Sequence, residues 1–305
     1  MNPCDQSLSD TASVIFSRGR VVSRAKFMKK RIFVYLILSV FFICGCGSLA
    51  VLKKRQNIAD DLASKNGFHK DVINTEYFTL TTYQKIADVS KPVNVYIEGD
   101  GYAWVSRTIL SYNPTPRYPF MLALAGVDPA ENVVYIARPC QYTDPEQEKL
   151  FDYSYWSDKR FSEEIIVSVN TAINKIMGQY GLSGIHLIGH SGGGAVAVLV
   201  ASRNNDVLSI RTIAANLDHV ELNKYHKVSP MKGSLNAIDV AEQVSSIPQR
   251  HFLGSKDKRI PEFIVKRFLQ RSGDDEFDSL LIVDGCDHDD GWKDKWVELL
   301  KEPLV

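Results

Sequence analysis

The sequence Gly-His-Ser-Gly-Gly at 189–193 places a serine among residues that could make it a nucleophile. An apolar run at 185–188 precedes it and small or apolar residues follow at 194–200, which predicts a strand, a tight turn and a helix. The flanking glycines would allow the strained backbone of such a turn, because a Cβ there would collide with the strand or the helix. Ser191 would then stand at the helix N-terminus, where unpaired N–H groups stabilise negative charge. The alternative is a glycine-rich turn with an ordinary surface serine.

The C-terminal part of the chain offers this serine an acid and a base in the order serine, acid, histidine. His288 comes just after the last apolar run, so it can reach Ser191 and act first as base and then as acid. Asp257 follows another apolar run and a glycine, and Pro261 behind it can open a helix at its first turn. The carboxylate of Asp257 would accept the Nδ1–H of His288 and fix its tautomer. Asp218, one strand earlier, is the alternative acid.

Both partner residues also have interpretations without catalysis. His288 could be a solvated loop histidine, or it could bind a metal together with Asp287 and Asp289. Asp257 could do no more than cap the helix that starts at 261. The serine and the order of the candidate residues argue against a metal, and no CxxC or Cys/His cluster suggests zinc. We therefore expect neither a metal nor a cofactor.

Hydrolysis through a serine also needs two backbone N–H groups that hold the developing oxyanion. The N–H of Gly192, directly after the nucleophile, is the first candidate. The second should come from the loop after an early strand, and the apolar run 93–97 leads into such a loop with Gly-Asp-Gly at 99–101. We predict the N–H of Asp100 as this donor, with Gly101 as the next choice. The same three residues could also form a plain turn.

Apolar runs without polar alternation recur along the chain, with helical stretches or loops between them. Such runs predict strands that are buried on both faces, as in a parallel sheet covered by helices. The predicted fold class is therefore α/β, with a mostly parallel central sheet flanked by helices. The expected strands are 72–80, 93–97, 133–137, 185–188, 210–214, 251–253 and 280–283.

The sequence pattern predicts fewer helices than strands. The clearest one covers 160–177, with a single apolar stripe and two glutamates near its start. A shorter helix is expected at 53–65, followed by Asn-Gly as a C-cap. Two longer polar stretches, 139–159 and 217–246, are expected to be loops. They could line a pocket or form a lid, or they could be surface loops without a role.

The N-terminus predicts a targeting segment. Three basic residues at 29–31 precede the apolar run 32–43, which is short for a membrane span and typical of a signal peptide. Ile-Cys-Gly-Cys at 43–46 resembles a bacterial lipobox, in which Cys46 would be lipidated and become the mature N-terminus. Met28 is a more natural start than Met1. The alternative is an uncleaved anchor helix.

This interpretation divides the chain into three parts. Residues 1–46 are the signal peptide and lipobox, with 1–27 as a mis-assigned extension, 47–70 are a tether and short helix, and 71–305 are the folded domain. The domain would be a membrane-anchored lipoprotein in the bacterial cell envelope, facing the periplasm or the exterior. Cys46 is followed by Gly-Ser rather than by the aspartate linked to inner-membrane retention, which favours the outer membrane.

The charge composition of the chain limits the kinds of partner it could bind. The 305 residues include 36 Lys+Arg and 36 Asp+Glu, and this net charge of zero argues against nucleic acid as an electrostatic partner. Residues 1–45 carry seven Lys/Arg against two Asp/Glu, so the rest of the chain, with 29 against 34, is mildly acidic. Cys140 and Cys286 could pair in an oxidising compartment, but two cysteines do not by themselves establish a disulfide.

Together these motifs resemble the α/β-hydrolase superfamily over residues 93–300. The resemblance is carried by Glu-Gly-Asp-Gly at 98–101, the turn at 189–193, Gly-x-x-Asp-x-x-Ile-Pro at 254–261, and His288. One departure is Glu98, where many members have histidine, although only a backbone donor is required nearby. The sequence Glu-Gly-Asp-Gly-Tyr-Ala-Trp at 98–104 also looks like a group of poorly characterised bacterial hydrolases that are often lipoproteins.

The resemblance implies a serine hydrolase with Ser191, His288 and Asp257 as a triad and an acyl-enzyme intermediate. Carboxylic esters are the expected substrates, with a small-molecule or lipid-like acyl group, and thioesters or amides remain open. The alternative is a catalytically silent protein of the same fold that serves as a binding or interaction module in the envelope, since fold alone does not fix function.

Overall fold

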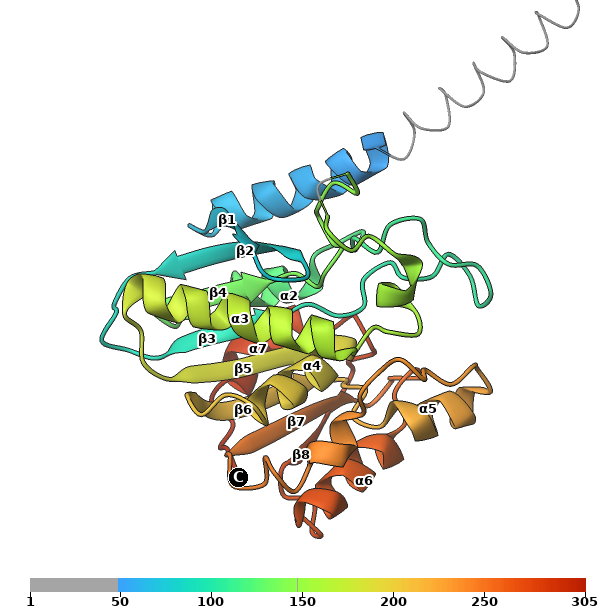
Figure 1. Ribbon diagram of the computed structural model, residues 1–305. Helices are drawn as coiled ribbons and strands as arrows, with labels where there is room; N and C mark the ends of the chain where they lie inside the picture. Colours follow the sequence, from blue (N-terminus) through green and yellow to red (C-terminus); the bar gives the residue numbers. More distant parts are fainter. Residues whose placement is uncertain (1–48, 147) are drawn as a thin grey trace, which may run out of the picture. The chain divides into compact units, whose positions relative to one another are not determined.

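The computed structural model describes residues 49–146 and 148–305. The chain divides into two compact units, Met1–Val51 and Leu52–Val305, and the second contains all the strands described here. Its centre is an eight-stranded sheet in the order β1-β2-β4-β3-β5-β6-β7-β8 (Figure 1). The pairs β1–β2 and β2–β4 are antiparallel, and all pairs from β4 to β8 are parallel. The strands are β1 (His69–Asn74), β2 (Thr79–Ile86), β3 (Val93–Ile97), β4 (Asn132–Ile136), β5 (Ile185–His190), β6 (Val207–Ile213), β7 (Gln249–Gly254) and β8 (Leu280–Val283).

Helices cover both faces of this sheet. Neighbouring residues of β3 point to opposite faces, so Val95 and Tyr96 belong to two different apolar clusters. The cluster with Val95 includes residues of α3, α4 and α6, and the cluster with Tyr96 includes residues of α2 and α7. The helices are α2 (Phe120–Ala125), α3 (Glu163–Tyr180), α4 (Gly192–Ala201), α5 (His219–His226), α6 (Glu262–Ser272) and α7 (Lys293–Leu299), with 3-10 turns η1 (Tyr153–Trp156) and η2 (Ala237–Val240).

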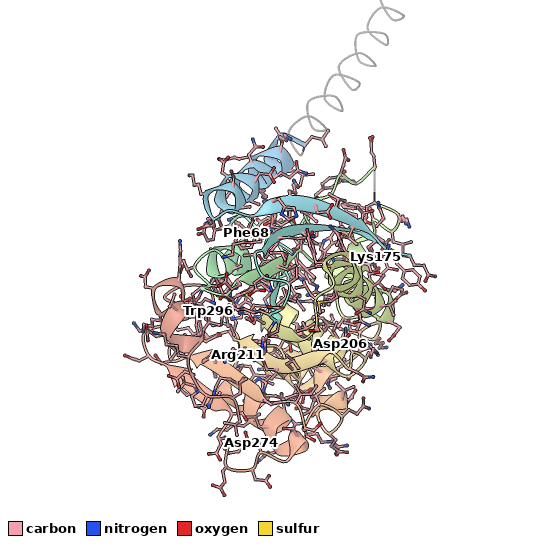
Figure 2. All side chains as sticks on the ribbon, turned by 90° about the vertical axis from the view of Figure 1, so that its left-hand side faces the viewer. Phe68, Lys175, Asp206, Arg211, Asp274 and Trp296 are labelled. Carbon is pink, nitrogen blue, oxygen red and sulfur yellow. The ribbon has the colours of Figure 1, made fainter. Side chains whose placement is uncertain are left out.

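The second cluster is held by a buried tryptophan. Trp296 of α7 (Figure 2) is fully buried, and its indole N–H donates to the hydroxyl of Tyr96 at 2.8 Å. Its ring also packs edge-on against Phe252 of β7, with 5.8 Å between ring centroids. Residues 49–65 form a helix, and its residues Ala59 and Ala63 are buried in the same cluster. The expected short helix is thus present and packs on the sheet.

The predicted α/β class is confirmed, and all six expected strands from 93–97 onward occur within a few residues of the expected bounds. Every residue of β4 and of β7 is buried, which explains the absence of polar alternation. Helix α4 is buried along its whole length of ten residues because it lies between the sheet and η2 and α3. The strand ends that lead into loops at one edge are the places where polar side chains gather.

The stretch 217–246, expected to be a loop, contains α5 and η2. Two other expected elements also differ from the structure. The single strand predicted at 72–80 is a hairpin of β1 and β2, because the hydroxyl and the N–H of Thr75 both bond to the carbonyl of Phe78 and close a turn. The helix predicted at 160–177 is α3, which begins after Ser162 and ends at Gly181, whose φ of 68° stops the helix. Threonine and aromatic residues favour strands, which hid the turn.

The N-terminal predictions fall mostly outside the described residues. The signal peptide, the lipobox and Cys46 lie in 1–48, which the structure does not describe. Within 49–146 and 148–305, the helices are all too short or too polar to cross a bilayer.

Candidate active site

Ser191 lies in the turn between β5 and α4, at the carboxyl edge of the parallel strands. Its φ of 52° and ψ of −118° are a strained combination for a residue with a side chain. The turn is so tight that a Cβ on Gly189 would collide with the backbone of Gly193, and one on Gly193 would collide with the backbone at the end of β3. The glycines of the motif are therefore required by close backbone approach, as the sequence predicted.

His288 lies against Ser191 although 97 residues separate them. Its Nε2 is 3.1 Å from the Ser191 hydroxyl oxygen, and its Nδ1 is 2.9 Å from Oδ2 of Asp257. A carboxylate can only accept, so Nδ1 carries the proton and Nε2 is free to accept from the serine. The Asp257 side chain is 1% exposed and the His288 side chain 7% exposed. The structure thus brings the three sequence-predicted residues into one hydrogen-bonded chain.

The second carboxylate oxygen of Asp257 fixes its own loop. Oδ1 accepts the N–H groups of Arg259 at 2.7 Å and Ile260 at 3.0 Å. Burial acts to raise the pKa of Asp257, but the bond from His288 and these backbone donors outweigh it, and the pKa lies below its usual value. Asp257 is therefore an anion that both orients His288 and caps the turn before α6. Pro261 occupies the residue before this helix rather than its first turn.

The alternative acid, Asp218, has different partners. It caps α5 by accepting the N–H of Glu221 at 3.2 Å, and it also accepts from Asn236 at 3.0 Å and from Arg267 at 3.0 Å. Within the described part of the chain it has no contact with His288. Its role is to fix the start of α5 in the loop between β6 and β7.

The two residues predicted to supply the oxyanion donors are in contact through the Asp100 side chain. The carboxylate of Asp100 is so close to Gly192 that a Cβ on this glycine would collide with it. Neither the N–H of Asp100 nor that of Gly192 has a hydrogen-bond acceptor in the described residues. Gly101, the next choice, has a φ of 63° and packs tightly on the carbonyl of Pro114, so it shapes the loop.

Glu98, the departure from the family pattern, is the buried support of this loop. Its carboxyl group accepts the N–H of Gly99 at 3.0 Å, the hydroxyl of Tyr135 at 3.0 Å and the N–H of Met121 at 3.3 Å. Burial raises the pKa of Glu98 to about 7, although these three donors act to lower it. Glu98 therefore ties the loop that carries Asp100 to β4 and α2.

His190, at the variable position of the Gly-x-Ser-x-Gly motif, is a site residue that the sequence pattern did not predict. Its Nε2 donates to the backbone carbonyl of His288 at 2.9 Å, and its ring lies between those of Phe120 and His288, with centroids 4.4 and 4.9 Å away. Burial, followed by the neighbouring His288, lowers the pKa of His190 to about 3, so it is neutral. Its place directly before the candidate nucleophile was the available signal.

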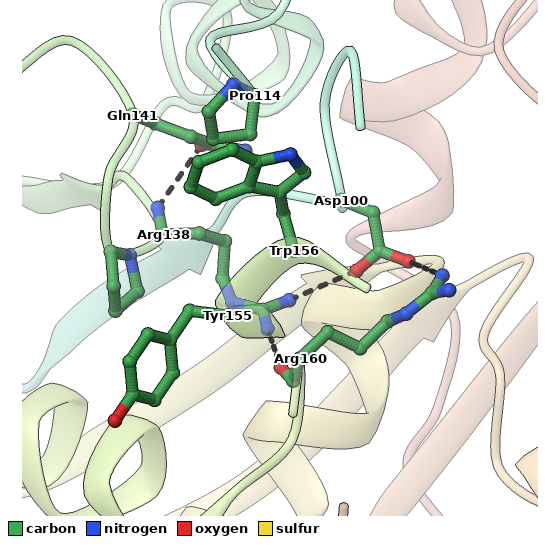
Figure 3. Close-up of a pocket in the computed structure, with 8 residues that line it drawn as sticks. Asp100, Pro114, Arg138, Gln141, Tyr155, Trp156 and Arg160 are labelled. Atoms are coloured by element: carbon green, nitrogen blue, oxygen red, sulfur yellow. Dashed lines mark hydrogen bonds and ion pairs between the residues drawn. The ribbon is translucent and has the colours of Figure 1, made fainter. Parts of the chain in front are cut away.

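Two arginines beside the loop that carries Asp100 were also not predicted from the sequence. Arg138 and Arg160 both form ion pairs with Asp100, at 3.3 and 2.8 Å (Figure 3). Arg138 lies two residues after the end of β4, and a charged residue near the carboxyl end of a buried parallel strand is a recognisable signal. Arg160 lies in a loop and carries no such signal.

A group of three possible metal ligands lies at the same edge. Nitrogen and oxygen atoms of His190, His288 and Asp289 are within 4.8 Å of one another. Both nitrogens of His288 are already engaged, and Nε2 of His190 donates to a carbonyl. Asp287 instead caps its own turn by accepting the N–H groups of Asp289 and Asp290. This donor set does not fit a resident metal.

The two candidate disulfide cysteines are free thiols. Cys140 and Cys286 are both buried, and they belong to the two different apolar clusters. Each thiol donates to a nearby carbonyl, Cys140 to Leu150 at 3.6 Å and Cys286 to Gly291 at 3.2 Å.

No protein-family model matches the chain, and no curated protein matches it. Several solved structures match in fold. The esterase Est1E from Butyrivibrio proteoclasticus matches with a TM-score of 0.53 at 12% identity, over 76% of this chain and 96% of that chain. The α/β-hydrolase GrgF from Penicillium gives 0.53 at 14% identity, over 76% and 94%. An esterase from Pyrococcus furiosus gives 0.52 at 14%, over 78% and 92%. The chain therefore has the α/β-hydrolase fold, as its motifs predicted.

Proposed function

We propose that the protein is a serine hydrolase that cleaves carboxylic esters, with thioesters and amides as further substrates of the same chemistry. The observation that carries this proposal is the hydrogen-bonded chain from Ser191 through His288 to Asp257, with contacts of 3.1 and 2.9 Å. Similarity to structures of two esterases supports placing esters first. A silent binding module would need neither this chain nor the strained serine.

The geometry supports acyl transfer in two halves. The Ser191 hydroxyl attacks the ester carbonyl while Nε2 of His288 takes its proton, and Asp257 stabilises the resulting imidazolium. The N–H groups of Asp100 and Gly192 hold the oxyanion of the tetrahedral intermediate. His288 then protonates the leaving alcohol, which departs and leaves an acyl-serine. Water attacks this acyl-serine with His288 again as base, which releases the acid and restores Ser191.

A fluorophosphonate probe tests this proposal on the full chain. Intact mass should show one adduct on the wild type and none on Ser191→Ala. Ser202→Ala is the matched control, because Ser202 follows the other end of α4 and its hydroxyl donates to the Leu199 carbonyl. Absence of any adduct on the wild type would refute the hydrolase, and labelling that persists in Ser191→Ala would refute Ser191 as nucleophile.

We also propose that Cys46 carries a lipid that tethers the domain to a bacterial membrane, which the lipobox-like sequence at 43–46 supports. Radiolabelled palmitate should be incorporated into the wild type and into Cys44→Ala, but not into Cys46→Ala. Equal incorporation in both variants, or none in the wild type, would refute this tether.

A further inference from the structure

Asp100 lies between two guanidinium groups beside the candidate oxyanion hole (Figure 3). Its Oδ1 is 3.3 Å from Nη1 of Arg138, and its Oδ2 is 2.8 Å from Nη1 of Arg160. The Asp100 carboxylate also touches Gly192, the residue after the nucleophile. A single carboxylate therefore separates the arginines from the start of α4, where an ester would bind.

The cluster holds two cations and one anion. Burial acts to raise the pKa of Asp100, whereas Arg160 and Arg138 lower it. The arginines together outweigh burial, so the pKa lies below its usual value and the carboxylate is charged. Neutralising Asp100 requires only one arginine, so these three side chains carry one excess positive charge among themselves. Glu98, whose pKa burial raises to about 7, is a further acid that acts on Arg138. A charge out of water is costly unless it is paired, and the N-terminus of α4 adds positive potential at the same place.

The two arginines use their donors differently. Arg138 is buried, and its Nη2 donates to the carbonyl of Arg160 while its Nε has no partner. Arg160 donates from Nε to the Ser157 carbonyl at 2.9 Å and from Nη1 to Asp100. Its Nη2 bonds to no residue within 49–146 and 148–305, and its side chain is 19% exposed. Arg160 therefore has free donors in a fixed fork, the geometry that suits carboxylates and phosphates.

The recess that these side chains share is small. It is lined by Asp100, Arg138 and Arg160 together with Gln141, Tyr155 and Trp156, and it has room for about one water molecule. A substrate group would therefore meet Arg160 at the edge of the recess rather than fill it.

We propose that Arg160, held in place by Asp100 and Arg138, binds a negatively charged group of the substrate. The preferred ester then carries a carboxylate or a phosphate a few bonds from the scissile carbonyl. This inference rests on the proposed serine hydrolase and names its substrate class. Binding would supply the missing counter-charge of the cluster and satisfy the free donors of Arg160.

Two matched substrate pairs test the charge preference in the full chain. The first pair is the 4-nitrophenyl hemisuccinate and its methyl ester, which differ by one charge on the acyl side. The second is butyryl glycerol 3-phosphate and butyryl glycerol, which differ on the alcohol side. We expect the ratio of kcat/KM, anionic to neutral, to reach about tenfold or more in at least one pair, as for other charge-assisted contacts.

The variant Arg160→Gln should bring that ratio close to one, because the amide carries no charge. Arg203→Gln is the matched control, since Arg203 pairs with Glu163 beyond the far end of α4 and should leave the ratio unchanged. An equal loss of kcat/KM on neutral and anionic esters in Arg160→Gln would mean that Arg160 only holds Asp100 in place, and it would overturn the proposal. A wild-type ratio near one in both pairs would also overturn it.

Two further measurements keep the test decisive. If Arg160→Gln does not fold by circular dichroism, the wild-type ratio should still fall as ionic strength rises, because salt screens a partly exposed charge. A ratio of anionic to neutral kcat/KM that does not change with ionic strength would overturn the proposal. Failure of the hydrolase itself is distinguishable, because then the neutral esters show no turnover that depends on Ser191.

Discussion

His190 and His288 are joined by a hydrogen bond from the ring Nε2 of the first to the backbone carbonyl of the second, at 2.9 Å. The residue beside the candidate nucleophile thus holds the loop that carries the candidate base. Gly99 packs on the other side of this ring, so that a Cβ there would lie 3.0 Å from Nδ1 of His190. His190 therefore links the oxyanion loop, the nucleophile turn and the histidine loop.

We expect His190→Leu to lower kcat by about tenfold to a hundredfold with little change in KM, because an aliphatic side chain cannot hold the His288 carbonyl and small displacements are costly. His190→Gln should recover part of the loss, since its amide donor has a similar reach. Ester turnover and fluorophosphonate labelling rates measure the effect, and thermal unfolding reports stability separately. Equal rates in the two variants would contradict a positioning role.

The sequence predicts the candidate triad, but it predicts only part of the residues that hold the triad in place. The parallel strands were predictable because β4 and β7 are buried on both faces and therefore lack polar alternation. Ser191, Asp257 and His288 were predictable because each follows a strand in a fixed order along the chain. Close backbone approach also made the glycines of the turn predictable.

The supporting residues were not predictable for a physical reason. Arg160 meets Asp100 across 60 residues of sequence, from a position predicted as the start of a helix but lying in the loop before α3, so nothing local marks the pair. Glu98 was noticed as a departure, but its burial depends on Tyr135 and Met121 from two other elements. The turn at Thr75 was hidden because the residues that form it also favour strands.

Asp257→Asn should lower kcat/KM by about a thousandfold or more, because the amide cannot stabilise the imidazolium of His288 or fix its tautomer. Asp218→Asn is the matched control: it should lower stability, because Asp218 caps α5, and leave ester turnover unchanged. Kinetics on a neutral 4-nitrophenyl ester measure both. Comparable losses in the two variants would contradict the choice of acid.

The same residue predicts a pH dependence of stability. The pKa of Asp257 lies below its unfolded value, so its ionised form stabilises the fold above about pH 4, and this contribution is lost as pH falls through the folded pKa. The stability difference between wild type and Asp257→Asn should therefore shrink in acid. Denaturant unfolding at a series of pH values measures it, and a difference that grows in acid would contradict the assignment.

Glu98 predicts the opposite dependence. Its folded pKa of about 7 exceeds the value of 4.5 for an ordinary glutamate, so the folded state holds this proton more tightly than the unfolded chain. The stability that this contributes is full below about pH 4 and is lost as pH rises toward 7. Wild type should therefore lose stability relative to Glu98→Gln between about pH 5 and pH 7. Glu298→Gln, at an exposed site on α7, is the control and should follow the wild type. A constant offset for Glu98→Gln would contradict the raised pKa.

The close contact between Gly192 and the Asp100 carboxylate can be tested by substituting Gly192, with Gly178 as a control. In Gly192→Ala the new methyl group would collide with the Asp100 carboxylate, which cannot swing away freely because Arg138 and Arg160 hold it. The oxyanion loop must shift, so we expect kcat to fall by about a hundredfold or more, as when an oxyanion donor is removed.

Gly178→Ala is the matched control, because Gly178 lies in α3 with nothing near its Cβ position. It should keep full activity and gain about 0.5–1 kcal/mol of stability from better helix propensity. Turnover by Gly192→Ala at the wild-type rate would show that Asp100 can move aside, and that the loop is not fixed by its two arginines.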